Sequence, residues 1–113
     1  MILYYLALSF ILMHEMDAIR CKEWRIFPLI SMLEDKLGYI VFVFLHIPLF
    51  YWVLSQSNNP SFRWGFDIFL MVHVGLHILF LKHKKNEFID WISWSIIIGA
   101  GVFGGLDLWF MSV

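Results

Sequence analysis

The chain has 113 residues, of which 61% are hydrophobic and only 15% are charged, and its formal net charge is −1 at neutral pH. Soluble domains carry about 25% charged residues, so this composition excludes an ordinary soluble domain and is typical of a membrane protein. The near-neutral charge argues against a nucleic acid as a partner, and the single cysteine, Cys21, excludes an internal disulfide.

Four apolar segments are long enough to cross a bilayer, which takes about 20 helical residues. They cover approximately residues 2–19, 37–54, 62–81 and 88–110. A secretory signal has basic residues before its apolar part, and no basic residue precedes the first segment here. We therefore expect a retained spanning helix there. The predicted fold is all-α: a single domain over residues 1–113 that forms a polytopic, four-helix transmembrane bundle surrounded by membrane lipid.

The first connection, residues 21–36, is too long for a tight turn. Four apolar residues recur in it at helical spacing: Trp24, Phe27, Ile30 and Leu33. This pattern predicts a short helix that lies in the membrane interface and bends at Pro28. In the second connection, Ser61 is a candidate cap for the third helix.

Basic residues are distributed unequally between the connections. Seven of the eight Lys and Arg residues lie in or next to the first and third connections: Arg20, Lys22, Arg25, Lys36, Lys82, Lys84 and Lys85. Only Arg63 lies on the opposite side, where we expect it to pair with Asp107. Cytoplasmic loops carry the excess of Lys and Arg, so we predict that both termini lie outside the cytoplasm.

The fourth segment contains a run of small residues. Ala100 and Gly104, and likewise Gly101 and Gly105, are four residues apart. Such pairs let helix backbones approach closely in lipid. Two uses are open: close packing inside one bundle, or a face that forms a homodimer or a larger membrane complex.

Residues 12–20, at the end of the first apolar segment, contain several ionisable side chains. If the first segment spans the membrane, His14, Glu15 and Asp17 lie below the lipid surface. Ionisable groups at that depth are costly, so they usually face the protein interior and mark a functional site.

The depth of the other histidines can be compared with that of His14. At a rise of 1.5 Å per residue, His14 and His77 lie about 6 Å inside the inner boundary, and His46 and His73 about 12 Å inside. Three helices therefore place four imidazoles in one layer of the inner leaflet.

Helical spacing indicates which of these side chains share a face. His73 and His77 are four residues apart, and His14 and Asp17 are three apart, so the members of each pair lie on one face. Glu15 points about 100° away from His14, either into the same interior or toward a neighbouring helix.

Imidazole and carboxylate are the ligand set of zinc, iron or manganese. We predict a transition-metal centre with ligands drawn from five residues: His14, Asp17, His46, His73 and His77. Asp17 is the favoured acid, and His46 adds a fourth imidazole or a bond to a ligand. Glu23, just outside the bilayer, is a candidate ligand or general base, and Glu15 is a second candidate catalytic acid.

Three stretches carry a resemblance to a known family: His14-Glu15-Met16-Asp17-Ala18, Glu23-Trp24-Arg25 and His73-x-x-Leu76-His77. They resemble motifs of small bacterial four-helix membrane proteins classed as a domain of unknown function. The resemblance extends over nearly the whole chain and implies a bacterial inner-membrane location. It implies no reaction, substrate or cofactor.

Three functions remain open. The first is a membrane-embedded metalloprotein, including an enzyme that acts on a lipid or another apolar substrate; the absence of His-Glu-x-x-His argues against a zinc peptidase. The second is a b-type haem or quinone protein in electron transfer, with His46 and His73 as axial haem ligands. The third is a non-catalytic subunit or small transporter whose polar cluster relays protons.

Overall fold

The computed structural model describes all 113 residues and consists of helices joined by short connections. The four long helices are α1 (Ile2–Arg20), α2 (Asp35–Ser55), α3 (Pro60–Leu79) and α4 (Trp91–Ser112). Three short 3₁₀ turns accompany them: η1 (Glu23–Arg25), η2 (Ile30–Met32) and η3 (Phe80–Lys82). All four α-helices are long and apolar enough to cross a membrane, so the all-α, four-helix prediction is confirmed.

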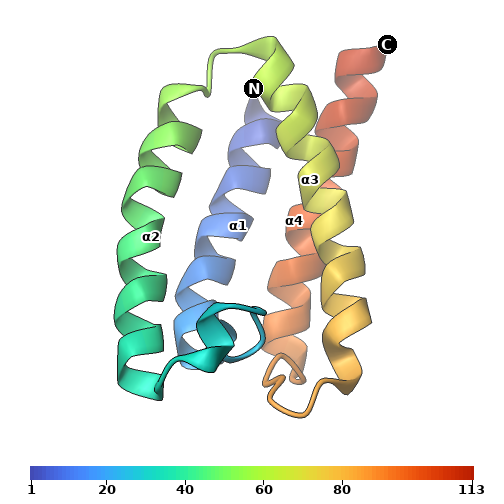
Figure 1. The fold of residues 1–113 in the computed structure, drawn as a ribbon. Helices are drawn as coiled ribbons and strands as arrows, with labels where there is room; N and C mark the ends of the chain where they lie inside the picture. The colour runs from blue at the N-terminus through green and yellow to red at the C-terminus, as the bar shows by residue number, and fades with distance from the viewer.

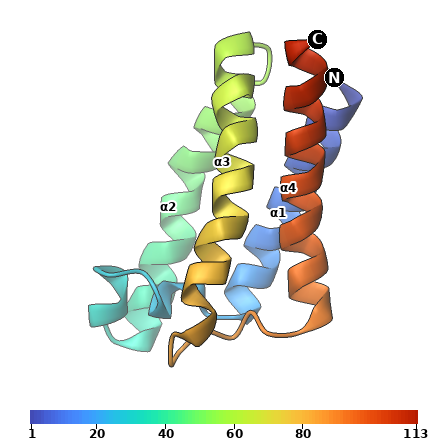
Figure 2. The ribbon, with the colours of Figure 1, turned by 90° about the vertical axis from the view of Figure 1, so that its right-hand side faces the viewer.

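The helices form a compact group of three with the fourth to one side. Helix α4 packs along both α1 and α3, whereas α2 mainly contacts η1 and η2 (Figure 1). Both termini lie at one end of the bundle, and the connections that precede α2 and α4 lie at the other, as the perpendicular view in Figure 2 also shows.

Two apolar clusters fill the interior. The cluster nearer the termini contains Tyr4, Ala7, Leu8, Ile11, Val53, Phe66, Leu70 and Ala100. The cluster nearer the connections contains Ala18, Cys21, Trp24, Ile26, Phe42, Phe88 and Ile97. Many other large apolar side chains point outward; for example, Met16 is 74% exposed and Ile47 is 64% exposed. An outer surface of this kind suits contact with lipid rather than water.

Side-chain caps decide where α3 and α4 begin. Asn59, and not the predicted Ser61, caps α3, because its Oδ1 accepts the Ser61 backbone N–H at 3.1 Å. Pro60 then takes the first helical position, where a missing N–H costs nothing. Asp90 caps α4 by accepting the Ser93 N–H at 2.8 Å, so this helix starts at residue 91 instead of 88.

The predicted interfacial helix takes the form of η1 and η2, two separate 3₁₀ turns. Pro28 lies between them and cannot donate the backbone bond that a continuous helix needs. Lys22 adopts a left-handed conformation (φ 51°) and turns the chain at the end of α1. Trp24 is buried after this turn, while Leu29 and Met32 are 80% and 81% exposed.

The small residues of α4 allow close contact inside the bundle. A β-carbon added at Gly99 would lie 2.5 Å from Phe10 Cε1, and one at Gly101 would lie 2.6 Å from Val74 Cγ2. One at Gly104 would lie 3.0 Å from Leu70 Cδ1. These glycines therefore permit the approach of α1 and α3 to α4.

Candidate metal centre

Three buried histidine rings meet between α1 and α3. His14 comes from α1 and has no exposed surface, whereas His73 and His77 come from α3 and are 8% and 6% exposed. The centroids of the three rings are 4.5 to 4.8 Å apart. We call His14, His73 and His77 the histidine triad.

The triad occupies positions that apolar residues would otherwise fill. On α1 the buried face includes Ala7, Ile11, His14 and Ala18. On α3 it includes Phe66, Leu70, His73 and His77. Both sets follow helical intervals of three and four, so the histidines extend the apolar stripes that hold the helices together. Phe88 covers the triad, with its ring 4.6 Å from His77 and 5.3 Å from His14 between centroids.

The ligand atoms of the triad are close enough for one ion. One nitrogen from each ring can be chosen such that all three lie within 4.8 Å of one another. His73 Nε2 and His77 Nε2 are 3.2 Å apart. Two nitrogens bound to one tetrahedral zinc ion at 2.0–2.1 Å are about 3.3 Å apart. These two rings already have the right separation, and His14 would have to approach them.

Several polar atoms of the triad have no hydrogen-bond partner. They are His14 Nδ1, His14 Nε2 and His73 Nδ1. An unsatisfied buried donor or acceptor costs about 1–3 kcal/mol. A bound cation would satisfy an imidazole lone pair that the protein leaves without a donor.

Glu23 is the carboxylate nearest the triad. Its Oε2 lies 3.2 Å from His14 Nε2, and its side chain is 9% exposed. The two atoms are close but lack hydrogen-bond alignment, so neither is satisfied by the other. Glu23, His73 and His77 also line one small cavity of about 70 Å³. Glu23 therefore lies beside the histidines, and its role as a ligand or general base stays a prediction.

Asp17, the favoured acidic ligand in the sequence prediction, lies outside the triad. Its carboxylate accepts a bond from Arg20 Nε at 2.8 Å and another from Ser93 Oγ at 2.5 Å. Asp17 therefore links α1 to α4 and does not face α3. The sequence spacing placed Asp17 on the face of His14, but in the structure Arg20 and Ser93 bind its carboxylate. Nothing in the sequence pattern singles out Ser93.

His46 and Glu15 form a separate pair between α2 and α1. His46 Nε2 lies 2.5 Å from Glu15 Oε2, and His46 Nδ1 lies 2.6 Å from the Phe42 carbonyl oxygen. Both ring nitrogens are thus engaged, and neither residue belongs to the triad. The pair lines an apolar groove of about 440 Å³. Glu15 approaches a neighbouring helix, one of its two predicted directions.

A second polar group lies near the termini. Arg63 Nη2 donates to both carboxylate oxygens of Asp107 at 3.0 Å, as expected from the sequence. The Arg63 guanidinium also lies 5.1 Å above the centroid of the Tyr4 ring. Asp67 is fully buried nearby, and neither of its carboxyl oxygens has a partner.

Cys21, which directly follows α1, is a buried free thiol. Burial raises its pKa to about 11, although the contact between its Sγ and Ser93 Oγ opposes the shift. The thiol is therefore protonated at neutral pH and is a poor metal ligand or nucleophile.

The fold is that of a multi-pass membrane protein, because all four α-helices are long and apolar enough to cross a membrane. A family model described as a family of unknown function (DUF6713) matches residues 1–113, and the chain belongs to this family. No curated protein and no solved structure matches the chain.

Proposed function

We propose that this protein binds a transition metal within the membrane, with the histidine triad as its ligands. The observation that supports this proposal is the convergence of three buried imidazoles, two of them with nitrogens that lack a partner. Zinc, iron and manganese all accept imidazole nitrogen.

Glu23 gives the proposed centre two possible forms. As a fourth ligand it would close a tetrahedral site of the structural kind. As a base beside a site with an open position it would accept a proton from a metal-bound substrate or water. An enzyme of the second form would act on a lipid or another apolar substrate, because the site lies between membrane-spanning helices.

The proposed setting is a bacterial inner membrane, with both termini outside the cytoplasm. Two features support this orientation: both termini are at one end of the bundle, and the basic connections are at the other. The positive-inside rule assigns the basic end to the cytoplasm.

Elemental analysis of protein purified in detergent without chelator tests the proposal. We expect close to one zinc, iron or manganese ion per chain in the wild type. His77→Ala should release most of it, whereas His83→Ala should retain it, because His83 is exposed in a connection. Metal at about 100 times its Kd should stabilise the wild type by about 2.7 kcal/mol.

Two further variants separate the candidate acids. Glu23→Gln should weaken metal binding about 10- to 100-fold, while Asp17→Asn should leave the metal content unchanged. If the wild type contains no stoichiometric metal and its Tm does not respond to added zinc, iron or manganese, the metal proposal is wrong.

A proton relay is the second candidate. It is favoured by two close contacts, 3.2 Å from Glu23 Oε2 to His14 Nε2 and 3.2 Å from His73 Nε2 to His77 Nε2, and by the His14 ring, which lies 4.5 Å from the His73 ring between centroids. Proton uptake by liposomes that contain the metal-free protein would support the relay, provided that His77→Ala abolishes this uptake. The haem alternative is less favoured, because both nitrogens of His46 are already bonded.

A further inference from the structure

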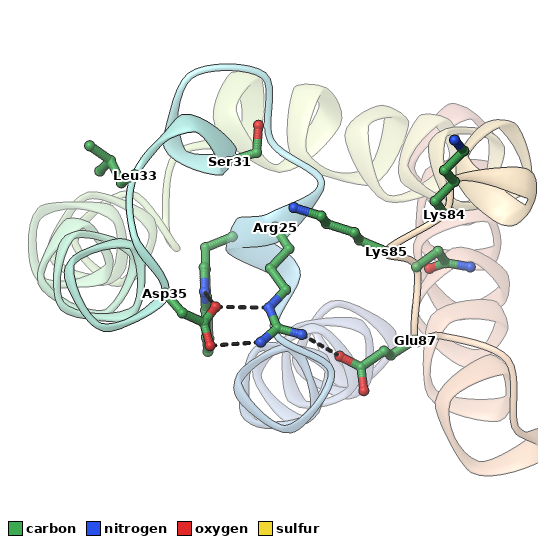
Figure 3. A pocket seen from close by; sticks show the side chains of 9 residues that line it. Arg25, Ser31, Leu33, Asp35, Lys84, Lys85 and Glu87 are labelled. Atoms are coloured by element: carbon green, nitrogen blue, oxygen red, sulfur yellow. Dashed lines mark hydrogen bonds and ion pairs between the residues drawn. The ribbon is translucent and has the colours of Figure 1, made fainter.

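A polar pocket lies at the end of the bundle where the two long connections meet. Residues 24–35 form one wall and residues 84–87 the other (Figure 3). Its volume is about 450 Å³, which is within the range of small-ligand sites. The histidine triad is not part of its lining.

The carboxylates of this pocket are already engaged by Arg25. Asp35 accepts two bonds from the Arg25 guanidinium, at 2.7 and 2.8 Å, and a third from Trp24 Nε1 at 2.9 Å. Glu87 Oε2 lies 3.7 Å from Arg25 Nη1. Asp35 therefore has little capacity left for a cation, and Glu87 is directed toward Arg25.

Most of the groups that remain free in the pocket are donors. Neither Lys84 nor Lys85 forms an ion pair, and Lys85 extends across the pocket toward Arg25 (Figure 3). Asn86 Nδ2 is buried without a partner. The orientation of this amide is fixed, because Asn86 Oδ1 accepts the Phe88 backbone N–H at 3.2 Å. Unused hydrogen-bonding capacity thus points to a ligand with anionic oxygen atoms.

The position of the pocket indicates where such a ligand comes from. Leu29 and Met32, in the same connection, are 80% and 81% exposed. Side chains this apolar next to a basic pocket are typical of a segment that lies at the lipid headgroups. The anionic group available at that level is the phosphate of a phospholipid.

We propose that this pocket binds the headgroup phosphate of an anionic phospholipid through Lys84, Lys85 and Asn86. Three cationic and two acidic side chains line the pocket. Their net charge of about +1 is balanced by the single negative charge of a phosphodiester. The proposal does not depend on the metal centre, although Glu23 and Arg25 belong to the same 3₁₀ turn.

Native mass spectrometry of the full chain in detergent tests this site. Phosphatidylglycerol and phosphatidylcholine with identical acyl chains are titrated separately, and we expect preferential binding of phosphatidylglycerol. The double variant Lys84→Gln/Lys85→Gln should lower that affinity about fivefold for each lysine removed. Asn86→Asp should abolish the preference for phosphatidylglycerol. The substitution replaces the free Nδ2 donor with a negative charge that repels the phosphate, while it keeps the oxygen that accepts the Phe88 N–H.

Two matched variants control for general charge effects. Lys82→Gln removes a lysine of the same connection that does not line the pocket, and Asn58→Asp adds the same charge as Asn86→Asp at the opposite end; both should keep the preference. Equal binding of the two lipids, or equal loss in Asn58→Asp and Asn86→Asp, would overturn the proposal. So would displacement of phosphatidylglycerol by millimolar inorganic phosphate, which would assign the pocket to a soluble anion.

Discussion

Most ionisable side chains within the helices have a partner of opposite charge. Arg63 binds Asp107, and Asp17 binds Arg20. Asp67 is different, because it is fully buried and neither of its oxygens has a partner. An unpaired charge at that position would be very costly, so we infer that Asp67 is uncharged. The two aspartates of this group, Asp67 and Asp107, should therefore respond differently to amidation.

Asp107→Asn should destabilise the protein by about 1–3 kcal/mol, because it leaves the half-buried Arg63 without its counter-charge. Asp67→Asn should change the free energy of unfolding much less, since an amide replaces a neutral acid of the same shape. Thermal unfolding of both variants in the same detergent measures the difference. Equal losses would show that Asp67 carries a charge in the folded protein.

At the scale of the elements, the bundle depends on how closely α4 approaches its neighbours. A β-carbon at Gly101 would come within 2.6 Å of Val74 Cγ2. Valine has one strongly preferred rotamer in a helix, so Val74 cannot easily turn aside. The contact between α3 and α4 therefore requires a residue without a side chain at this position.

Gly101→Leu should lower stability by about 1–3 kcal/mol through overpacking, and Gly104→Leu should act in the same direction. Gly75→Leu is the matched control, because a β-carbon at Gly75 would meet no heavy atom within 4 Å. The measurements are the Tm and the oligomer size in detergent. Unchanged values in both α4 variants would mean that this face of α4 meets lipid.

At the scale of the whole molecule, both termini lie at one end and both basic connections at the other. Cysteine labelling in intact cells can report which end faces outward. Cys21 contributes little background, because it is 1% exposed and burial raises the pKa of its thiol to about 11. Asn58 is a better labelling position than Asn59, which caps α3.

A membrane-impermeant maleimide should label Asn58→Cys in intact cells and should label Lys82→Cys only after the membrane is permeabilised. The reason is the excess of basic residues at the end that contains Lys82. Lys82→Cys labelled from outside, with Asn58→Cys protected, would establish the reverse orientation.

The sequence by itself determined the features that depend on local composition. Four apolar segments of sufficient length predicted four spanning helices, and helical spacing placed His73 and His77 on one face. The depth estimate brought His14 into the same layer. Charge placement also predicted the Arg63–Asp107 pair, which the structure confirms. Length, depth and spacing along one helix follow from a fixed rise and rotation per residue.

Only the tertiary structure decided which of these polar groups meet. Depth does not specify how a helix is rotated toward its neighbours, so it could not separate His46, which pairs with Glu15, from the triad. The structure also decided which acid lies beside the triad. The turn at Lys22 brings Glu23 close to His14. Asp17 is instead bound by Arg20 and Ser93. These outcomes result from packing between distant segments, and no local pattern in the chain encodes that packing.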